Sequence, residues 1–174
     1  MQANETHTDA KSNGWLWGRW SALGLTVALA TAIIDQAHKY WMIYIYDIQS
    51  KGRVEVTPFL DLVFVKNTGI SYSMFATDTM EGQLILASFA AVASIAMWVW
   101  LSRSATGRLM TWSIALIIGG AIGNAIDRLT LGGVADFFSA HAFGFYWYVF
   151  NIADMAIVAG VVGLLYDSFR PESA

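Results

Sequence analysis

The 174-residue chain contains no cysteine, which excludes disulfide bonds, a cysteine nucleophile and thiolate metal ligands. It has only three histidines, and His7, His38 and His141 lie far apart in the sequence. A zinc protease of the H-E-x-x-H type needs two histidines one helical turn apart. No G-x-S-x-G serine motif with an obvious histidine base is present either. The sequence therefore predicts neither a metal site nor a cofactor.

Charged residues are scarce as well. Asp, Glu, Lys and Arg make up 13% of the chain, about half of the roughly 25% found in soluble domains. The net charge of −3 and the pI near 5.5 argue against nucleic acid as a partner. Four apolar segments approach the roughly 20 residues that cross a bilayer: residues 20–34, 84–101, 109–126 and 148–166. Trp and Tyr cluster near their ends, as at a membrane interface. The composition predicts a multi-pass membrane protein.

The segments between the apolar runs set the expected domain organisation. Residues 1–14 are polar and without periodicity, which predicts a disordered leader. Residues 15–168 form one expected domain, followed by a short tail at 169–174. Within about 40–80, "RVEVTPFLDLVFVKNTGISYSMF" is rich in Val, Phe and Tyr and predicts short strands and turns. The polar stretch 129–147 is expected to connect the last two apolar segments, with Asp136 in a short loop.

Polar residues inside or beside the apolar segments gather at one end of those segments. The set is Asp35, Lys39, Asn124, Asp127, Arg128, Asp136, Asn151 and Asp154. Within each segment they stand three or four residues apart, so each group lies on one helical face. A charged group inside a membrane is costly and usually marks function. A shared polar site near one membrane surface explains these residues better than independent snorkelling at helix ends.

Carboxylates are the reactive groups that remain for such a site. Two Asp side chains that share a proton can hold a water, one acting as base while the other donates to a carbonyl oxygen. Asp136 and Asp154 would supply this pair, and Asn124 and Asn151 would supply neutral hydrogen-bond donors. A proton-relaying transporter or a non-catalytic scaffold stays an alternative. The small residues of "ALATA" at 28–32 also leave a cleaved signal peptide open.

Four blocks of sequence carry a resemblance to a known family. They are "DQAHK", "FVKNTGISYSMF", "GGAIGNAIDRLTLGGVADFF" and "FNIADMAI", and the last two together are highly specific. Over roughly residues 20–168 the chain resembles bacterial lipoprotein signal peptidases, the signal peptidase II family of aspartic peptidases. Two departures from the family pattern are "ISYS" at 70–73 and Met155, and neither falls on an expected catalytic residue.

The resemblance implies an activity and a set of roles. The expected enzyme is an aspartic endopeptidase that removes signal peptides from diacylglyceryl-modified prolipoproteins, cutting just before the lipidated cysteine. Asp136 and Asp154 would be catalytic, and Asn67, Asn124, Arg128 and Asn151 would bind substrate. Asp35 and Lys39 would form a structural pair at the rim of the site, with Asp127 also in support. The inhibitor globomycin would bind between the two catalytic residues.

The resemblance also implies an all-α membrane architecture. Four transmembrane helices would carry a small β-rich cradle after the first helix, on the extracytoplasmic face of the bacterial inner membrane. Both termini would be cytoplasmic, and the protein would work as a monomer in contact with membrane lipid. The ten basic residues divide evenly between the two sides. Only the hairpin at 102–108, with two Arg and no acid, favours this orientation.

Overall fold

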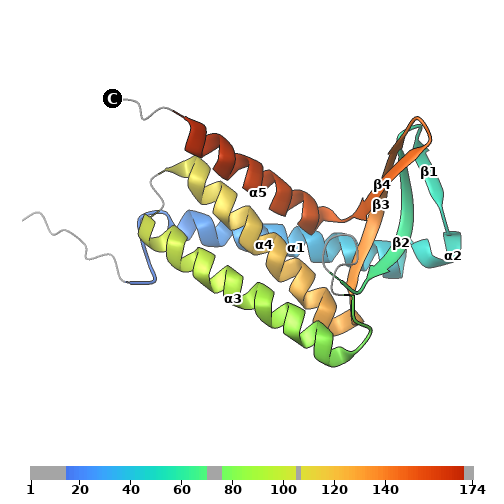
Figure 1. Cartoon of the computed structure of the whole chain (residues 1–174), viewed down its shortest axis with the longest axis horizontal. Coiled ribbons are helices and arrows are strands. Elements are labelled where there is room, and N and C mark those ends of the chain that lie inside the picture. Colours follow the sequence, from blue (N-terminus) through green and yellow to red (C-terminus); the bar gives the residue numbers. More distant parts are fainter. Residues whose placement is uncertain (1–14, 70–75, 105–106, 171–174) are drawn as a thin grey trace, which may run out of the picture.

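Four long helices form a bundle, and a four-stranded antiparallel sheet stands at one end of it (Figure 1). The computed structural model describes residues 15–69, 76–104 and 107–170. The predicted leader at 1–14, the departure at 70–73 and the last four residues of the chain lie outside the described residues.

The long helices follow the apolar segments but differ from them at their ends. They are α1 (Ser21–Tyr40), α3 (Met80–Ser104), α4 (Arg108–Leu131) and α5 (Ile152–Phe169). In the described part of the chain, α3, α4 and α5 are long and apolar enough to cross a membrane. α1 has 20 residues, but its last two turns carry Asp35, His38 and Lys39. The prediction of a fourth span therefore stays a prediction.

The sheet corrects the sequence-based prediction for residues 129–147. It contains β1 (Val54–Thr57), β2 (Leu60–Asn67), β3 (Val134–Ala142) and β4 (Phe145–Phe150), hydrogen-bonded in that order. Half of the sheet thus comes from the chain between α4 and α5, and Asp136 lies on a strand instead of in a loop. Aromatic residues favour strands there, and a left-handed turn at Phe143 and Gly144, with φ of 52° and 79°, joins them.

Two short helical elements connect α1 to the sheet. The π-helix η1 (Trp41–Ile45) continues directly from α1, and α2 (Ile48–Lys51) precedes β1. Met42 and Ile48 from these elements are buried with Ala135 and Phe137 of β3. This small core attaches the sheet to the end of the helical bundle.

The helix α4 lies at the centre of the bundle and packs against α1, α3 and α5. Its first half contributes Ile114, Ala115 and Ile118 to an apolar core. Gly119 and Gly120 permit close approach, because a Cβ atom on them would lie 2.5 Å from the carbonyl oxygens of Ala28 and Ala153, respectively. The small residues in this segment therefore serve helix packing.

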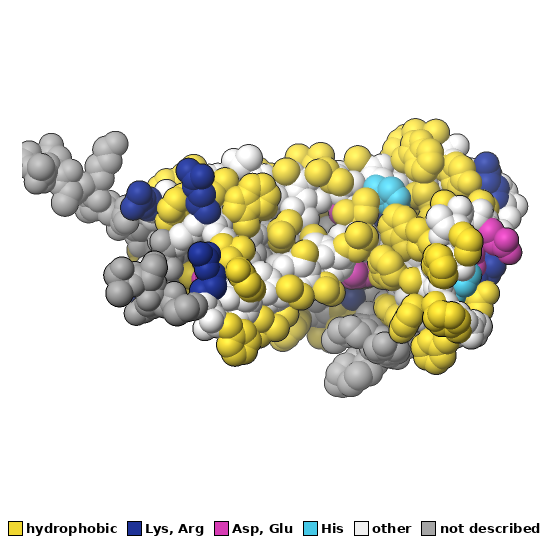
Figure 2. Space-filling view, turned by 90° about the horizontal axis from the view of Figure 1, so that it is seen from above, with side chains coloured by type: hydrophobic (Ala, Val, Ile, Leu, Met, Phe, Trp, Pro, Cys, Tyr) yellow, Lys and Arg dark blue, Asp and Glu magenta, His cyan; other side chains and the backbone are white. Residues whose placement is uncertain are grey.

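Hydrophobic side chains cover most of the visible flank of the helices (Figure 2). Lys and Arg side chains gather at the end far from the sheet, and acidic and basic side chains appear together at the sheet end. Exposed apolar residues such as Phe89, Val92 and Val158 lie on the helix surfaces. This distribution suits a bundle whose middle is surrounded by lipid.

Candidate active site

Asp136 and Asp154 come from different elements and are joined by two asparagine amides. Asp136 lies on β3 and is 1% exposed, and Asp154 lies in the first turn of α5. Asn151 Nδ2 donates to Asp136 Oδ1 at 2.6 Å and to Asn124 Oδ1 at 3.2 Å. Asn124 Nδ2 in turn donates to Asp154 Oδ1 at 2.9 Å. The structure therefore brings both expected catalytic residues and two expected substrate-binding residues into one network.

Local capping chemistry fixes the position of Asp154. Asn151 is the N-cap of α5, and its Oδ1 accepts a hydrogen bond from Asp154 N at 2.9 Å. Asp154 Oδ2 accepts from Asn151 N at 3.2 Å. This reciprocal arrangement is a capping box, which satisfies backbone N–H groups at a helix start. Asp154 is thus the third residue of the helix at its polar end, instead of six residues inside an apolar span.

Asn67 at the end of β2 extends the network toward a cavity. Val65 is paired with Asp136, so Asn67 lies diagonally across the sheet from that carboxyl group. Asn67 Nδ2 donates to Asp136 Oδ2 at 3.3 Å and also to the hydroxyl of Tyr148. A cavity of about 270 Å³ is lined by these residues together with Lys66 and Trp147. One of the two carboxyl groups therefore borders a space large enough for part of a substrate.

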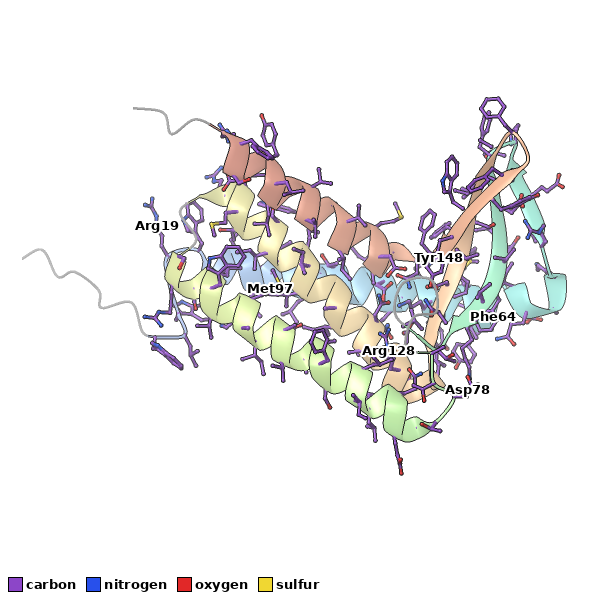
Figure 3. All side chains as sticks on the ribbon, in the orientation of Figure 1. Arg19, Phe64, Asp78, Met97, Arg128 and Tyr148 are labelled. Atoms are coloured by element: carbon purple, nitrogen blue, oxygen red, sulfur yellow. The ribbon has the colours of Figure 1, made fainter. Side chains whose placement is uncertain are left out.

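Arg128 lies at the junction of the bundle and the sheet, where Figure 3 labels it with Tyr148. Its side chain is buried, and it donates to Asn124 O at 3.1 Å and to Gly69 O at 3.0 Å. Its Nε has no hydrogen-bond partner within the described part of the chain. Arg128 therefore links α4 to the chain after β2, close to the two carboxyl groups.

Tyr148 is a site residue that the sequence reasoning missed. Its hydroxyl accepts from Asn67, and its side chain helps to line the cavity beside Asp136. Its position at the start of the apolar segment 148–166, beside Trp147, predicts a place in an aromatic belt at the membrane interface. The alternating aromatic residues of "FYWYVF" could instead have indicated a strand.

The expected pair of Asp35 and Lys39 is present, with 2.8 Å between Asp35 Oδ2 and Lys39 Nζ. Both residues are buried, at 0% and 2% exposure, so they lie beneath the site and not at its rim. Lys39 Nζ also lies 2.7 Å from Asp127 Oδ2. Asp127 thus shares the ammonium group of Lys39 with Asp35.

Burial and charge repulsion make Asp136 an unusually weak acid. Burial raises the pKa of Asp136 from 3.8 to about 7, and the neighbouring Asp154 charge adds to this increase. Hydrogen bonds from Asn151 and Asn67 oppose the increase. Asp136 can therefore keep its proton near neutral pH.

Across residues 15–69, 76–104 and 107–170, no three His, Asp or Glu side chains form a group that could hold a metal ion.

Comparisons with known proteins agree with this geometry. A sequence profile of the family described as "Signal peptidase (SPase) II" matches residues 27–170. A lipoprotein signal peptidase of Nitrobacter hamburgensis is 52% identical over 150 residues, which are 84% of this chain and 91% of that protein. A lipoprotein signal peptidase of Rhodopseudomonas palustris shows the same identity and coverage.

Two solved structures are also similar, and both are described as bacterial membrane enzymes studied by the in meso method. The first has a TM-score of 0.72 and 26% identity, covering 86% of this chain and 94% of that chain. The second has a TM-score of 0.69 and 28% identity, covering 88% and 93%. With its bundle, its paired carboxyl groups and these matches, the chain belongs to the signal peptidase II family of peptidases.

Proposed function

We propose that this chain removes the signal peptides of diacylglyceryl-modified prolipoproteins, cutting just before the lipidated cysteine. Its relatives carry the name lipoprotein signal peptidase. The observation that carries the proposal is the pair of carboxyl groups, Asp136 and Asp154, bridged by Asn124 and Asn151 beside a cavity. In this proposal the two Asp residues are the catalytic dyad.

The proposed reaction is hydrolysis by a shared proton. Asp136 carries the proton at rest, in keeping with its pKa of about 7, and Asp154 is ionised. A water between them attacks the scissile carbonyl carbon, while Asp154 takes a proton from the water and Asp136 protonates the carbonyl oxygen. The diol then collapses as the C–N bond breaks. The leaving amine takes the proton from Asp154, and a diol hydroxyl returns a proton to Asp136.

The remaining polar residues orient the carboxyl groups and the peptide. Asn124 and Asn151 hold the carboxyl groups through amide donors, and their own orientation is fixed by the same bonds. Asn67 and Arg128 stand where the cavity and the chain after β2 meet, and we assign them to the substrate backbone. Arg128 Nε has no hydrogen-bond partner among the described residues, and in this proposal it donates to a peptide carbonyl of the bound substrate.

We place the site at the extracytoplasmic face of the bacterial inner membrane. In this arrangement α1 is the fourth span, both termini are cytoplasmic, and Arg103 and Arg108 of the α3–α4 hairpin face the cytoplasm. A reporter that is active only outside the cytoplasm should work when inserted within 45–69 and fail when fused after Arg170. The reverse pattern would put the site on the wrong side for this function.

A proton-relaying transporter is less well supported. Such a protein needs carboxylates at several depths along a path. Here the buried Asp35 and Asp127 contact backbone amides directly beside Asp154 and Asp136. The buried carboxylates of the helices therefore gather at the sheet end, which suits one reaction centre.

The decisive experiment compares two substrates with the purified chain in lipid. One prolipoprotein carries diacylglycerol on its cysteine, and the other is the unmodified precursor. Each buried methylene is worth about 0.8 kcal/mol, so the acylated form should be cut far faster, and globomycin should compete with it. Equal rates on both forms would show that lipid is not recognised. No cleavage of either form would refute the proposed function. A single species with the protein mass of one chain, measured in lipid or detergent, would support a monomer.

A further inference from the structure

The ammonium group of Lys39 has three partners, and each of them leads toward the proposed dyad. Lys39 Nζ lies 2.8 Å from Asp35 Oδ2, 2.7 Å from Asp127 Oδ2 and 3.1 Å from Asn124 Oδ1. An ammonium group has three N–H donors, so this set uses all of them. The side chain is 2% exposed, which removes competition from water.

Two of these partners hold the backbone directly before a proposed catalytic residue. Asp35 Oδ1 accepts from Ala153 N at 2.9 Å, and Ala153 precedes Asp154. Asp127 Oδ2 accepts from Ala135 N at 3.1 Å, and Ala135 precedes Asp136. Both alanines are completely buried. The same arrangement therefore occurs twice, once for each carboxyl group of the dyad.

The third partner acts through a side chain. Asn124 accepts from Lys39 with its Oδ1 and donates with its Nδ2 to Asp154 Oδ1. Because the amide oxygen faces the cation, the amide nitrogen must face the carboxylate. Lys39 thus also selects the orientation of Asn124 that favours an ionised Asp154.

A second polar side chain reinforces the arrangement. Gln36 Nε2 donates to Asp127 Oδ1 at 2.9 Å, to Asp35 Oδ2 at 3.2 Å and to Gly123 O at 3.0 Å. Two buried carboxylates close to one another repel, and burying them is costly unless their charge is balanced. Lys39 supplies the only positive charge among these contacts. Without it, only neutral groups would hold the two carboxylates in place.

We infer that Lys39 is the positioning residue of the dyad, because its single ammonium group fixes the backbone before both Asp136 and Asp154 through Asp35 and Asp127. This inference builds on the proposed dyad and adds a residue that acts through others. A simple structural ion pair would affect only folding. A positioning residue also affects the geometry in which the two carboxyl groups react, and a misplacement of about 1 Å can lower a rate about a hundredfold.

The charge test replaces Lys39 by Met and measures turnover of the diacylglyceryl-modified prolipoprotein in lipid. We expect kcat of Lys39→Met to fall about a hundredfold while KM changes less than about threefold. The cationic charge of Lys39 also lowers the pKa of Asp136, so the alkaline limb of the kcat/KM profile of Lys39→Met should move to higher pH. Lys51→Met is the matched control, since Lys51 is exposed and lies over the Tyr46 ring.

A second test is steric and leaves every charge in place. It replaces the charge test if the Lys39→Met variant does not insert into the membrane. A Cβ on Gly123 would lie 2.5 Å from Asp35 Oδ2, so Gly123→Ala moves that carboxylate. A Cβ on Gly119, one turn earlier in α4, would lie 2.5 Å from Ala28 O. Gly119→Ala therefore crowds the same helix without touching the Lys39 contacts.

The two glycine variants distinguish a positioning role of Lys39 from a purely structural ion pair. We expect Gly123→Ala to lose about tenfold or more in kcat with KM nearly unchanged, and Gly119→Ala to lose thermal stability with nearly normal kcat. Equal kcat losses in the two variants, or a Lys39→Met variant with normal kcat, would overturn the inference. Wild-type chain that fails to cut the substrate would instead refute the proposed function.

Discussion

The two halves of the α1–α4 contact are built from opposite kinds of residue. Away from the sheet, these two helices bury no charged residue: Val27, Ala28, Ile114, Ala115 and Ile118 form an apolar core, beside the small polar residues Ser21, Thr111 and Ser113. Toward the sheet, the same two helices bury Asp35, Lys39, Asn124, Asp127 and Arg128. The helices continue without interruption from one region to the other.

The difference separates residues that stabilise the bundle from residues that form the proposed site. In lipid, apolar helices associate through close packing and small residues, as in the first half. Burying charged groups in the second half does not improve stability over an apolar core and is tolerated because each charge has partners. We therefore assign the polar half to the proposed reaction and the apolar half to holding the bundle together.

The largest expected effect concerns the proposed dyad in the polar half. Asp136→Asn and Asp154→Asn keep shape but remove the acid or the base, which is typically worth about 10²–10⁴-fold in rate. The double variant should be hardly slower than either single variant, because the two groups act as a unit. Turnover of the lipidated substrate by inserted protein measures this. Asp127→Asn should lose less and keep measurable turnover, because Asp127 acts only through Ala135 and Lys39. Near-normal cleavage by either dyad variant would end the assignment.

The pH dependence tests the same half without a mutation. Because the pKa of Asp136 is about 7, kcat/KM should fall about tenfold per pH unit above that value as its proton is lost. Stability should change too. The folded pKa lies above the unfolded value of 3.8, so the folded state binds more protons and loses stability as pH rises from about 4 to 7.

Thermal unfolding across that pH range measures the stability change, with Asp136→Asn as the control. The Asn variant should lack the part of the pH dependence that Asp136 causes. A wild-type rate that stays flat up to pH 9 would contradict the assignment of the resting proton to Asp136.

The apolar half should respond in stability alone. Ile114 is completely buried in the core shared by α1, α3 and α4, so Ile114→Ala leaves a cavity. We expect a loss of about 2 kcal/mol in unfolding free energy, the lower end for such changes, because lipid reduces the transfer contribution. Thermal unfolding and kcat of the folded fraction should be measured together. A large loss of kcat at unchanged stability would show that the two halves are not separate.

The smallest effect is expected at the edge of the polar half. Tyr148→Phe removes the hydroxyl that accepts from Asn67. One hydrogen bond contributes about 0.5–1.5 kcal/mol, so kcat/KM should drop by roughly twofold to tenfold. Phe145→Leu, an exposed position on the same strand, is the control. A loss as large as that of the dyad variants would make Tyr148 part of the chemistry.

The helices and the polar set could be predicted from the sequence because both follow local rules. Hydropathy located α3 and α4 to within five residues, since apolar runs of this length have few other uses. Spacing of three and four residues placed Asn124, Asp127 and Arg128 on one helical face. The structure adds that this face is turned inward.

What the sequence did not predict depends on contacts between distant segments. The sequence predicts a polar connection over residues 129–147, which hold β3 and the start of β4 in the structure, because His141 and Gly144 interrupt the aromatic pattern and the pairing of β3 with β2 joins residues far apart. The start of α5 was placed at Tyr148 for the same reason. The burial of Lys39 depends on α4, whose Asn124 and Asp127 enclose its ammonium group.

The capping box of α5 gives one carboxylate two duties. Asp154 Oδ2 accepts the N–H of Asn151 and so stabilises the first turn, while Asp154 Oδ1 faces the amide of Asn124. An alanine at this position would remove both the cap and the proposed catalytic carboxylate, whereas asparagine retains an oxygen for the cap. An inactive but well-folded protein for trapping substrates is accordingly best made with asparagine.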